Sequence, residues 1–291
     1  MGWMPNEKGQ SDGSSGGPDP QVGKKRIWRM QIGLYLRFAY RTSTPLLTSQ
    51  LILLMLQRKF DQVVRQLFPN AMDAKDTSIH FLGKLQNDYG IDISKMLMAT
   101  SVCSDDINVP STTFFNVLFG PFAMGGLGGL PFAGETGMTA FAHHIPDGGA
   151  AFIFYGPHIG LTLEGDLGKM YRPRQDKPGN SCGALMLALQ RFQQDPGYLP
   201  KVRDDDYQQM MLEHSLVARK AEFLDDPRPQ RRITEVTFDN IDQKIHQYIE
   251  ACKGEFHIDR IALLGGIIIN TDYGLDDYFD VRNFEVMDLK G

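Results

Sequence analysis

Three side chains suited to binding a transition metal stand where predicted strands end or a predicted helix begins. Cys103 closes the apolar run 96–102. His158 lies in a Gly-Pro turn after a second apolar strand, and Cys182 opens a helix. Sites in open α/β sheets form beyond the carboxyl ends of the strands, and a thiol at a helix N-terminus is stabilised as the thiolate that binds zinc. Two thiolates and one imidazole leave a fourth tetrahedral position open, as in catalytic zinc sites.

Each of the three side chains also has a plainer interpretation. A cysteine after an apolar strand is often a packing residue, and a histidine in a turn or a cysteine at a helix start can be structural. Their wide spacing matches no compact C-x-x-C signature. Residue chemistry alone therefore leaves a metal site and ordinary packing both open.

Composition limits the class of protein. With 42% hydrophobic and 22% charged residues in 291, the chain is typical of a globular protein with a substantial core. A net charge of -5 argues against a nucleic-acid partner, and we interpret the locally basic stretch 23–41 as a solvated or partner-facing surface. The longest apolar run, 51–57, is far shorter than the roughly 18 residues of a membrane span.

The N-terminus and the cysteine count give two further expectations. Residues 1–23 are rich in Gly, Ser and Pro and are predicted to be a disordered leader, followed by one domain over 24–291. Acids in the leader argue against a transit peptide. Three cysteines are too few for a disulfide framework, which favours a reducing compartment.

Helical and strand patterns alternate along the chain. We expect helices over 44–68, 76–90, 180–192, 205–223 and 240–252, and strands over 96–102, 151–155, 159–163 and 260–270. Asp76 or Thr77 is the expected cap of the second helix, and Asn180 or Ser181 that of the third. Helices between continuously apolar strands predict an α/β fold, with a mostly parallel central sheet flanked by helices on both faces and room for one antiparallel edge.

Four segments together resemble one known family. They are "SVCSDDIN" (101–108), "GGLGGLPFAGETGMTAFAHHIPDGG" (125–149), "FYGPHIGL" (154–161) and "NSCGALMLA" (180–188). In this order they resemble the limiting-CO2-inducible B/C (LCIB/C) family of algae, which is similar to β-class carbonic anhydrases.

The resemblance implies a fold like that of β-carbonic anhydrases and a zinc ion (Zn2+) held by Cys103, His158 and Cys182. It also implies Asp105 as the carboxylate beside the metal. The implied activity is the interconversion of CO2 and bicarbonate in a CO2-concentrating mechanism. The implied assembly is a homodimer or a hetero-oligomer with a related chain. The implied place is the chloroplast stroma, with mitochondrial and cytoplasmic settings left open.

The chemistry of this carboxylate gives two alternatives. Hydration of CO2 needs hydroxide, which zinc provides by lowering the pKa of water to about 7, and Asp105 would orient it. A carboxylate free to swing would instead close the site. In β-class enzymes the arginine of C-x-D-x-R prevents this, but Ile107 stands at that position here. If Arg41, Arg172 or Arg174 replaces it, the chain is an active enzyme; otherwise it is a catalytically silent zinc-binding subunit that assembles with a related active chain.

Other motifs are less informative. The stretch 125–134 lacks the G-K-[ST] of a phosphate loop, so its glycines are interpreted as allowing close backbone approach near the site, with Leu130, Pro131 and Phe132 lining an apolar pocket for CO2. A zinc hydrolase or deaminase is a third hypothesis, but the H-x-E and P-C-x-x-C signature of deaminases is absent.

A loop with three titratable residues raises the question of proton transfer. Glu135, His143 and His144 are either proton shuttles that approach the metal or ordinary hydrogen-bonded turn residues.

Overall fold

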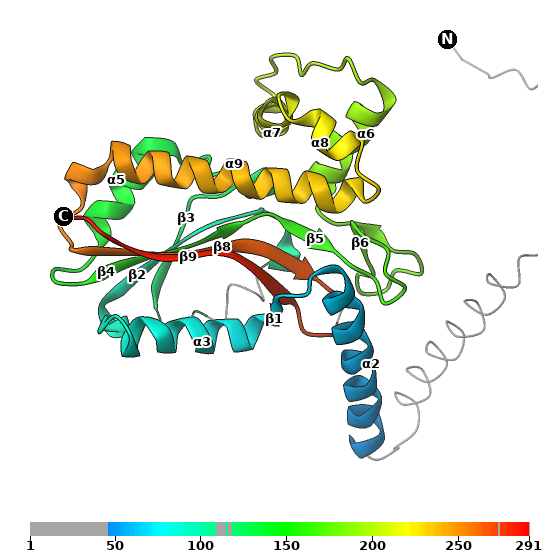
Figure 1. Ribbon diagram of the computed structural model, residues 1–291, viewed down its shortest axis with the longest axis horizontal. Helices are drawn as coiled ribbons and strands as arrows, with labels where there is room; N and C mark the ends of the chain where they lie inside the picture. Colours follow the sequence, from blue (N-terminus) through cyan, green and yellow to red (C-terminus); the bar gives the residue numbers. More distant parts are fainter. Residues whose placement is uncertain (1–45, 109–114, 116–117, 273, 291) are drawn as a thin grey trace, which may run out of the picture. The chain divides into compact units, whose positions relative to one another are not determined.

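The computed structural model describes residues 46–108, 115, 118–272 and 274–290 (Figure 1). The chain divides into two compact units, residues 1–54 and residues 55–291. The elements below belong to the second unit, except that helix α2 (Leu46–Leu67) begins in the first. The predicted leader 1–23 and the basic stretch 23–41 lie outside the described residues.

The core of the second unit is one mixed sheet. Its strands follow the order β1, β9, β8, β4, β2, β3, and β5 also pairs with β8. Their bounds are β1 Ala71–Asp73, β2 Met96–Val102, β3 Phe119–Ala123, β4 Ala150–Gly156, β5 His158–Gly160, β8 Arg260–Asn270 and β9 Tyr278–Asp288. The central strands are parallel, whereas β9 and β1 are antiparallel to their neighbours. The predicted mostly parallel sheet with an antiparallel edge is confirmed.

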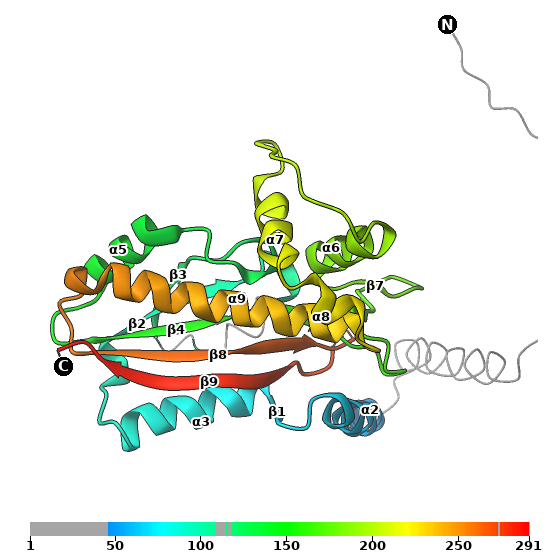
Figure 2. The same ribbon diagram turned by 45° about the horizontal axis from the view of Figure 1, so that its top comes forward.

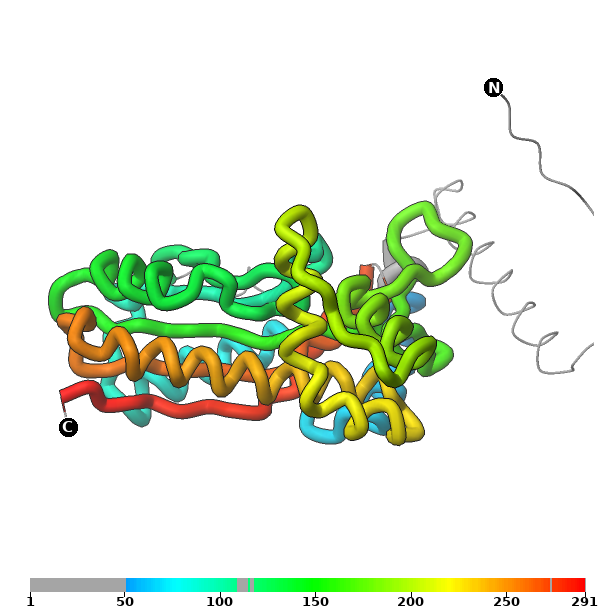
Figure 3. The backbone as a smooth tube through the Cα atoms, turned by 90° about the horizontal axis from the view of Figure 1, so that it is seen from above, coloured from blue at the N-terminus to red at the C-terminus, as the bar shows by residue number. Residues whose placement is uncertain are grey.

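Helices cover both faces of this sheet. Their bounds are α3 Ala74–Asn87, α5 Gly134–His144, α6 Gly183–Gln194, α7 Tyr207–Val217, α8 Lys220–Leu224 and α9 Pro229–Ala251. Helix α3 lies on one face, and α5 and α9 lie on the other (Figures 1 and 2). Helix α9, orange, runs along the strands when the molecule is seen from above (Figure 3). Strand β4 is buried on both faces: Ile153 and Tyr155 join the core under α9, and Phe152 and Phe154 join the core over α3.

The strongest apolar patterns were predicted with the right bounds. Strands β2 and β8 span 96–102 and 260–270, as expected. Helix α3 begins earlier than expected, because the carboxylate of Asp73 accepts hydrogen bonds from the amides of Lys75 and Asp76 and so caps it. Cys182 itself is the N-cap residue of α6, where Asn180 or Ser181 was expected.

Several predicted bounds were wrong. The helix expected over 205–223 is two helices, α7 and α8, and the helix expected over 240–252 already begins at Pro229. The strand expected over 159–163 is the short β5. Helix α5 and strand β9 were not predicted. In the described part of the chain, no helix combines the length and apolar character needed to cross a bilayer.

The parallel strands define where a site can form. The carboxyl ends of β2, β4 and β8 lie at the same edge of the sheet, because the register pairs Val102 with Gly156 and Tyr155 with Gly265. Residues that follow β2 and β4 therefore meet the end of β8, which is Asn270.

Candidate metal centre

Cys103, His158 and Cys182 come together at this edge of the sheet. Their ligand atoms all lie within 4.8 Å of one another, and all three side chains are buried. The two sulfur atoms are 3.6 Å apart. Zinc–sulfur bonds of about 2.3 Å at the tetrahedral angle place two sulfurs about 3.8 Å apart, so this spacing suits one shared ion. The structure thus brings the three predicted residues together, and their role as metal ligands stays a prediction.

The imidazole of His158 fits a metal for a second reason. It is fully buried, and its Nε2 has no hydrogen-bond partner among the described residues. Its Nδ1 lies 2.7 Å from Oδ1 of Asn270. A buried nitrogen without a partner is costly unless it binds a metal. The set of two thiols and one such imidazole is that of a transition-metal site.

The two cysteines differ in acidity. The hydrogen bond from Cys103 lowers the pKa of Cys182; burial opposes this, and the amides of Leu185 and Ala184 at the start of α6 add to the lowering. The hydrogen bond to Cys182, together with burial, raises the pKa of Cys103 well above its usual range. Cys182 is therefore the more acidic of the two thiols, and the thiolate is the form that binds a metal.

Asp105 has the arginine partner that its sequence motif lacks. Nη2 of Arg172 lies 2.5 Å from Oδ1 of Asp105, and Nη1 lies 2.7 Å from Oδ1 of Asp106. The hydrogen bond from Arg172 also lowers the pKa of Asp106. The carboxylate of Asp105 is not a member of the cluster of ligand atoms, although its charge acts on Cys182. The guanidinium therefore holds the carboxylate beside the cluster and outside it.

The three candidate arginines differ in whether they contact Asp105. Arg172, in the loop after the short strand β6 (Lys169–Met170), is the partner of Asp105. Arg174 is exposed and forms no ion pair within the described part of the chain. Arg41 lies outside the described residues.

The glycine-rich stretch does allow close backbone approach. A Cβ on Gly129 would lie 2.6 Å from the carbonyl oxygen of Gly156, at the end of β4. The hydroxyl of Ser101 on β2 donates to the carbonyl of Gly129 over 2.9 Å. Gly129 ends a 3-10 helix, Leu127–Gly129, that is thereby fixed beside the ends of β2 and β4. Leu130, the first of the residues expected to line an apolar pocket, is buried in the core.

His143 does not approach the metal cluster. Its Nε2 lies 2.9 Å from Oε2 of Glu255, and its ring stacks on His257 with 6.3 Å between centroids. His257 precedes β8, at the amino ends of the strands. Glu135 is at the same end, where its carbonyl accepts from Cys252. These contacts lie at the other end of the sheet from the cluster, which favours ordinary hydrogen-bonded roles for His143 and Glu135.

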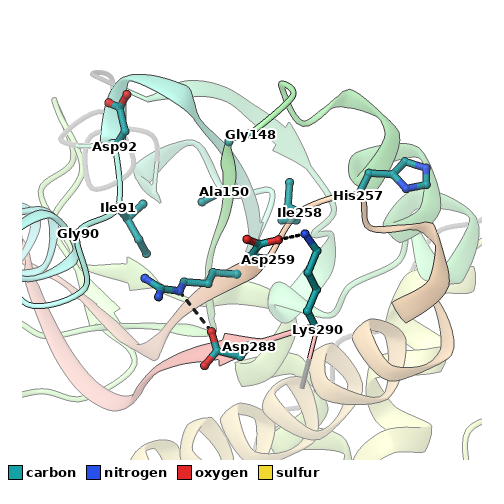
Figure 4. A pocket seen from close by; sticks show the side chains of 12 residues that line it. Gly90, Ile91, Asp92, Gly148, Ala150, His257, Ile258, Asp259, Asp288 and Lys290 are labelled. Atoms are coloured by element: carbon teal, nitrogen blue, oxygen red, sulfur yellow. Dashed lines mark hydrogen bonds and ion pairs between the residues drawn. The ribbon is translucent and has the colours of Figure 1, made fainter.

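A cavity of about 790 Å³ lies at that same remote end (Figure 4). Arg260, Asp288, Asp259 and Lys290 are among its lining residues. Arg260 pairs with Asp288 over 3.3 Å, and Lys290 pairs with Asp259. Arg260 and Lys290 are thus already paired with carboxylates. The cavity is separate from the cluster of Cys103, His158 and Cys182.

Comparison with known proteins agrees with the geometry. Residues 74–288 match the family model described as Limiting CO2-inducible proteins B/C beta carbonic anhydrases. The crystal structure of PtLCIB4, a homolog of the limiting CO2-inducible protein LCIB, is 31% identical over 79% of this chain and 96% of its own, with a TM-score of 0.73. The crystal structure of LCIB itself is 20% identical over 76% of this chain and 96% of its own, with a TM-score of 0.58. A comparison with curated proteins found no match. The chain therefore belongs to the family of limiting CO2-inducible proteins B/C beta carbonic anhydrases.

Proposed function

We propose that the protein is a zinc-dependent carbonic anhydrase that interconverts CO2 and bicarbonate. The family and the cluster of Cys103, His158 and Cys182 support a metal-dependent activity of this class. One observation carries the choice of an active enzyme over a silent subunit: Arg172 holds Asp105 at 2.5 Å. In the β-class pattern an arginine performs this task, and its absence from the motif was the reason to doubt activity.

The residues have distinct roles in the proposal. Cys103, His158 and Cys182 would hold the zinc ion, which when bound would supply a Lewis acid that lowers the pKa of water to about 7. The carboxylate of Asp105, fixed by Arg172, would accept a hydrogen bond from the nucleophilic oxygen and so orient its lone pair towards CO2. Arg172 would also keep the carboxylate of Asp105 from turning towards Cys103, His158 and Cys182.

The test combines metal analysis with stopped-flow CO2 hydration at pH values from about 6.5 to 9. We expect one zinc per chain and a rate that rises with pH. Asp105→Asn should keep its zinc and lose turnover, because a neutral amide is a weaker hydrogen-bond acceptor than a carboxylate and would not orient the nucleophilic oxygen as well.

Three outcomes would contradict parts of the proposal. Full zinc without turnover would favour a zinc-binding subunit that assembles with a related active chain. Turnover retained in Asp105→Asn would remove Asp105 from the mechanism. A protein that binds no zinc would contradict the metal site itself.

A further inference from the structure

We propose that Asn270 and Asn108 form a hydrogen-bonded bridge that holds His158 in the orientation and tautomer needed to bind the metal, a role that rests on the metal site proposed above. Asn270 is the last residue of β8, and Asn108 ends the 3-10 helix Asp106–Asn108 just after Cys103. Both side chains are buried, with 0% and 2% of their surface exposed. Buried amides with no contact to solvent are retained where their hydrogen bonds have a specific task.

Asn270 is the closest partner of His158. Its Oδ1 lies 2.7 Å from Nδ1 of the imidazole. The hydroxyl of Ser181 is a weaker alternative at 3.5 Å from the same nitrogen. The parallel pairing of β5 with β8 brings His158 and Asn270 together, because its register matches Gly160 with Asn270.

The surroundings of Asn270 fix which end of its amide faces the imidazole. Its Nδ2 faces three acceptors: Oδ2 of Asp277 at 3.2 Å, the carbonyl of Ile107 at 3.4 Å and Oδ1 of Asn108 at 3.5 Å. The nitrogen must be the donor to this group of oxygens, so the amide oxygen faces His158. Nδ1 of His158 then donates its hydrogen, and the lone pair is left on Nε2, the buried atom without a hydrogen-bond partner among the described residues.

Asn108 extends the bridge to a second ligand. Its Nδ2 donates to the backbone carbonyl of Cys103 over 3.2 Å, and its Oδ1 accepts from Asn270. Three hydrogen bonds therefore connect the backbone of Cys103 to the imidazole of His158. Because both amides are buried, neither can replace a lost partner with bulk water, and a change in one displaces the other.

The first test is the zinc affinity of Asn270→Leu, measured by competition with a chromophoric chelator, with the visible spectrum of bound Co(II) as a second readout. Leucine has a similar volume but cannot accept from Nδ1. Loss of such an outer-shell partner lowers metal affinity by about 10- to 100-fold, which is the expected result. The matched control is Asn240→Leu on α9, which loses a 2.8 Å hydrogen bond to the carbonyl of Ser215 but should bind zinc as the unchanged protein does.

The second test restores the acceptor. Asn270→Asp combined with Asp277→Asn exchanges the amide and the carboxylate, so that an oxygen again faces Nδ1 of His158, while the hydrogen bond to Oδ1 of Asn108 is lost. We therefore expect a zinc affinity between that of Asn270→Leu and that of the unchanged protein. A folded double variant that binds zinc as weakly as Asn270→Leu would contradict the role given to the acceptor.

The outcomes separate the bridge from the metal site. Undiminished affinity in a folded Asn270→Leu would overturn the bridge, whereas failure of the unchanged protein to bind zinc would overturn the proposed site. If Asn270→Leu does not fold, Asn108→Ala replaces it, because it removes the hydrogen bonds to Cys103 and Asn270. About a tenfold weaker affinity is then expected, and an unchanged affinity would overturn the bridge.

Discussion

Nη2 of Arg172 lies 2.5 Å from Oδ1 of Asp105, although the two residues are 67 positions apart in the chain. Both side chains are partly buried, with 25% and 17% of their surface exposed. The same guanidinium binds Asp106 through its other nitrogen. The arginine that contacts Asp105 thus comes from a distant loop rather than from two positions after the aspartate, and the second carboxylate fixes the plane of its guanidinium.

Removal of this guanidinium should lower activity without removing the metal. Arg172→Ala frees the carboxylate of Asp105, and a misplaced catalytic group can cost about 100-fold in rate. We expect a loss of that order in kcat/KM for CO2 hydration, with zinc content unchanged. Arg172→Lys should recover only part of it, because an ammonium cannot bind two carboxylates as a planar fork does.

The matched control for this variant is Arg174→Gly. Arg174 is exposed and has φ of 63°, a conformation that glycine adopts without strain. It should retain full turnover. Equal losses in the two variants would mean that the charge of the loop matters and that the contact with Asp105 does not.

Metal binding should appear as thermal stability. A ligand that binds only the folded state adds about 2.7 kcal/mol at 100 times its Kd. We expect added zinc to raise the Tm of the unchanged protein and a strong chelator to lower it. Cys103→Ser, which is nearly isosteric, should show a much smaller response to either treatment in differential scanning fluorimetry.

A matched thiol variant separates metal binding from the loss of a buried sulfur. Cys252→Ser changes a cysteine that is also buried but lies at the far end of the sheet, near Glu135. It should keep the full zinc response. A normal zinc response in Cys103→Ser would contradict the ligand assignment.

The sequence predicted those parts of the fold that depend on long apolar runs. Strands β2 and β8 are continuous hydrophobic segments bounded by polar residues, so their limits could be read directly. Strand β9 was missed because Arg282 and Glu285 interrupt its pattern; it is an edge strand along most of its length and tolerates charge there. Helix α5 was missed because its glycines indicate a loop, whereas tertiary packing of Met138 and Phe141 stabilises it.

The sequence predicted the three residues that cluster, but not the residues that contact them. Cys103 and His158 could be identified because each follows an apolar strand, and Asn270 has the same signal, since it ends β8. Asn270 was not predicted as a site residue, because an amide side chain is not a preferred ligand of zinc. The choice of Arg172 among three arginines depends on how the loop after β6 folds back over Asp105, which no local pattern reveals.

A glycine in β8 should be required for stability. Tyr155 pairs with Gly265 across the sheet, and a Cβ at Gly265 would lie 2.4 Å from the Tyr155 ring. The ring crosses the glycine so that its hydroxyl reaches the carboxylate of Asp242 on α9 over 2.5 Å. Gly265→Ala must displace the ring, and we expect a loss of about 1–3 kcal/mol in the free energy of unfolding by urea.

A double variant and a control at a second glycine test whether the clash with the Tyr155 ring causes this loss. Gly265→Ala combined with Tyr155→Ala should cost less than the sum of the single changes, because the clash is gone. Gly83→Ala on α3 has only an atom of Asn87 as near as 4.0 Å and should stabilise by about 0.5–1 kcal/mol. Additive costs in the first case would show that the ring is not the obstacle.

A histidine on α9 should make stability depend on pH. Burial lowers the pKa of His246, but hydrogen bonds to the backbone of Asp242 and to Glu285 outweigh it and raise the pKa above the ordinary value. Nε2 lies 2.5 Å from Oε1 of Glu285, which also accepts from Asn283. Since the folded-state pKa is the higher one, the stabilisation is complete below about pH 6.5 and is lost as pH rises through the folded value.

The measurement is urea unfolding at about pH 6 and about pH 8.5 for the unchanged protein, His246→Gln and His214→Gln. His214 is exposed on α7 and serves as the matched control. We expect the unchanged protein and His214→Gln to lose the same stability between the two pH values. His246→Gln should lose less, because only that variant lacks the imidazolium that donates to Glu285 in the folded state. An identical pH dependence in all three proteins would mean that the ion pair between α9 and β9 does not contribute to folding.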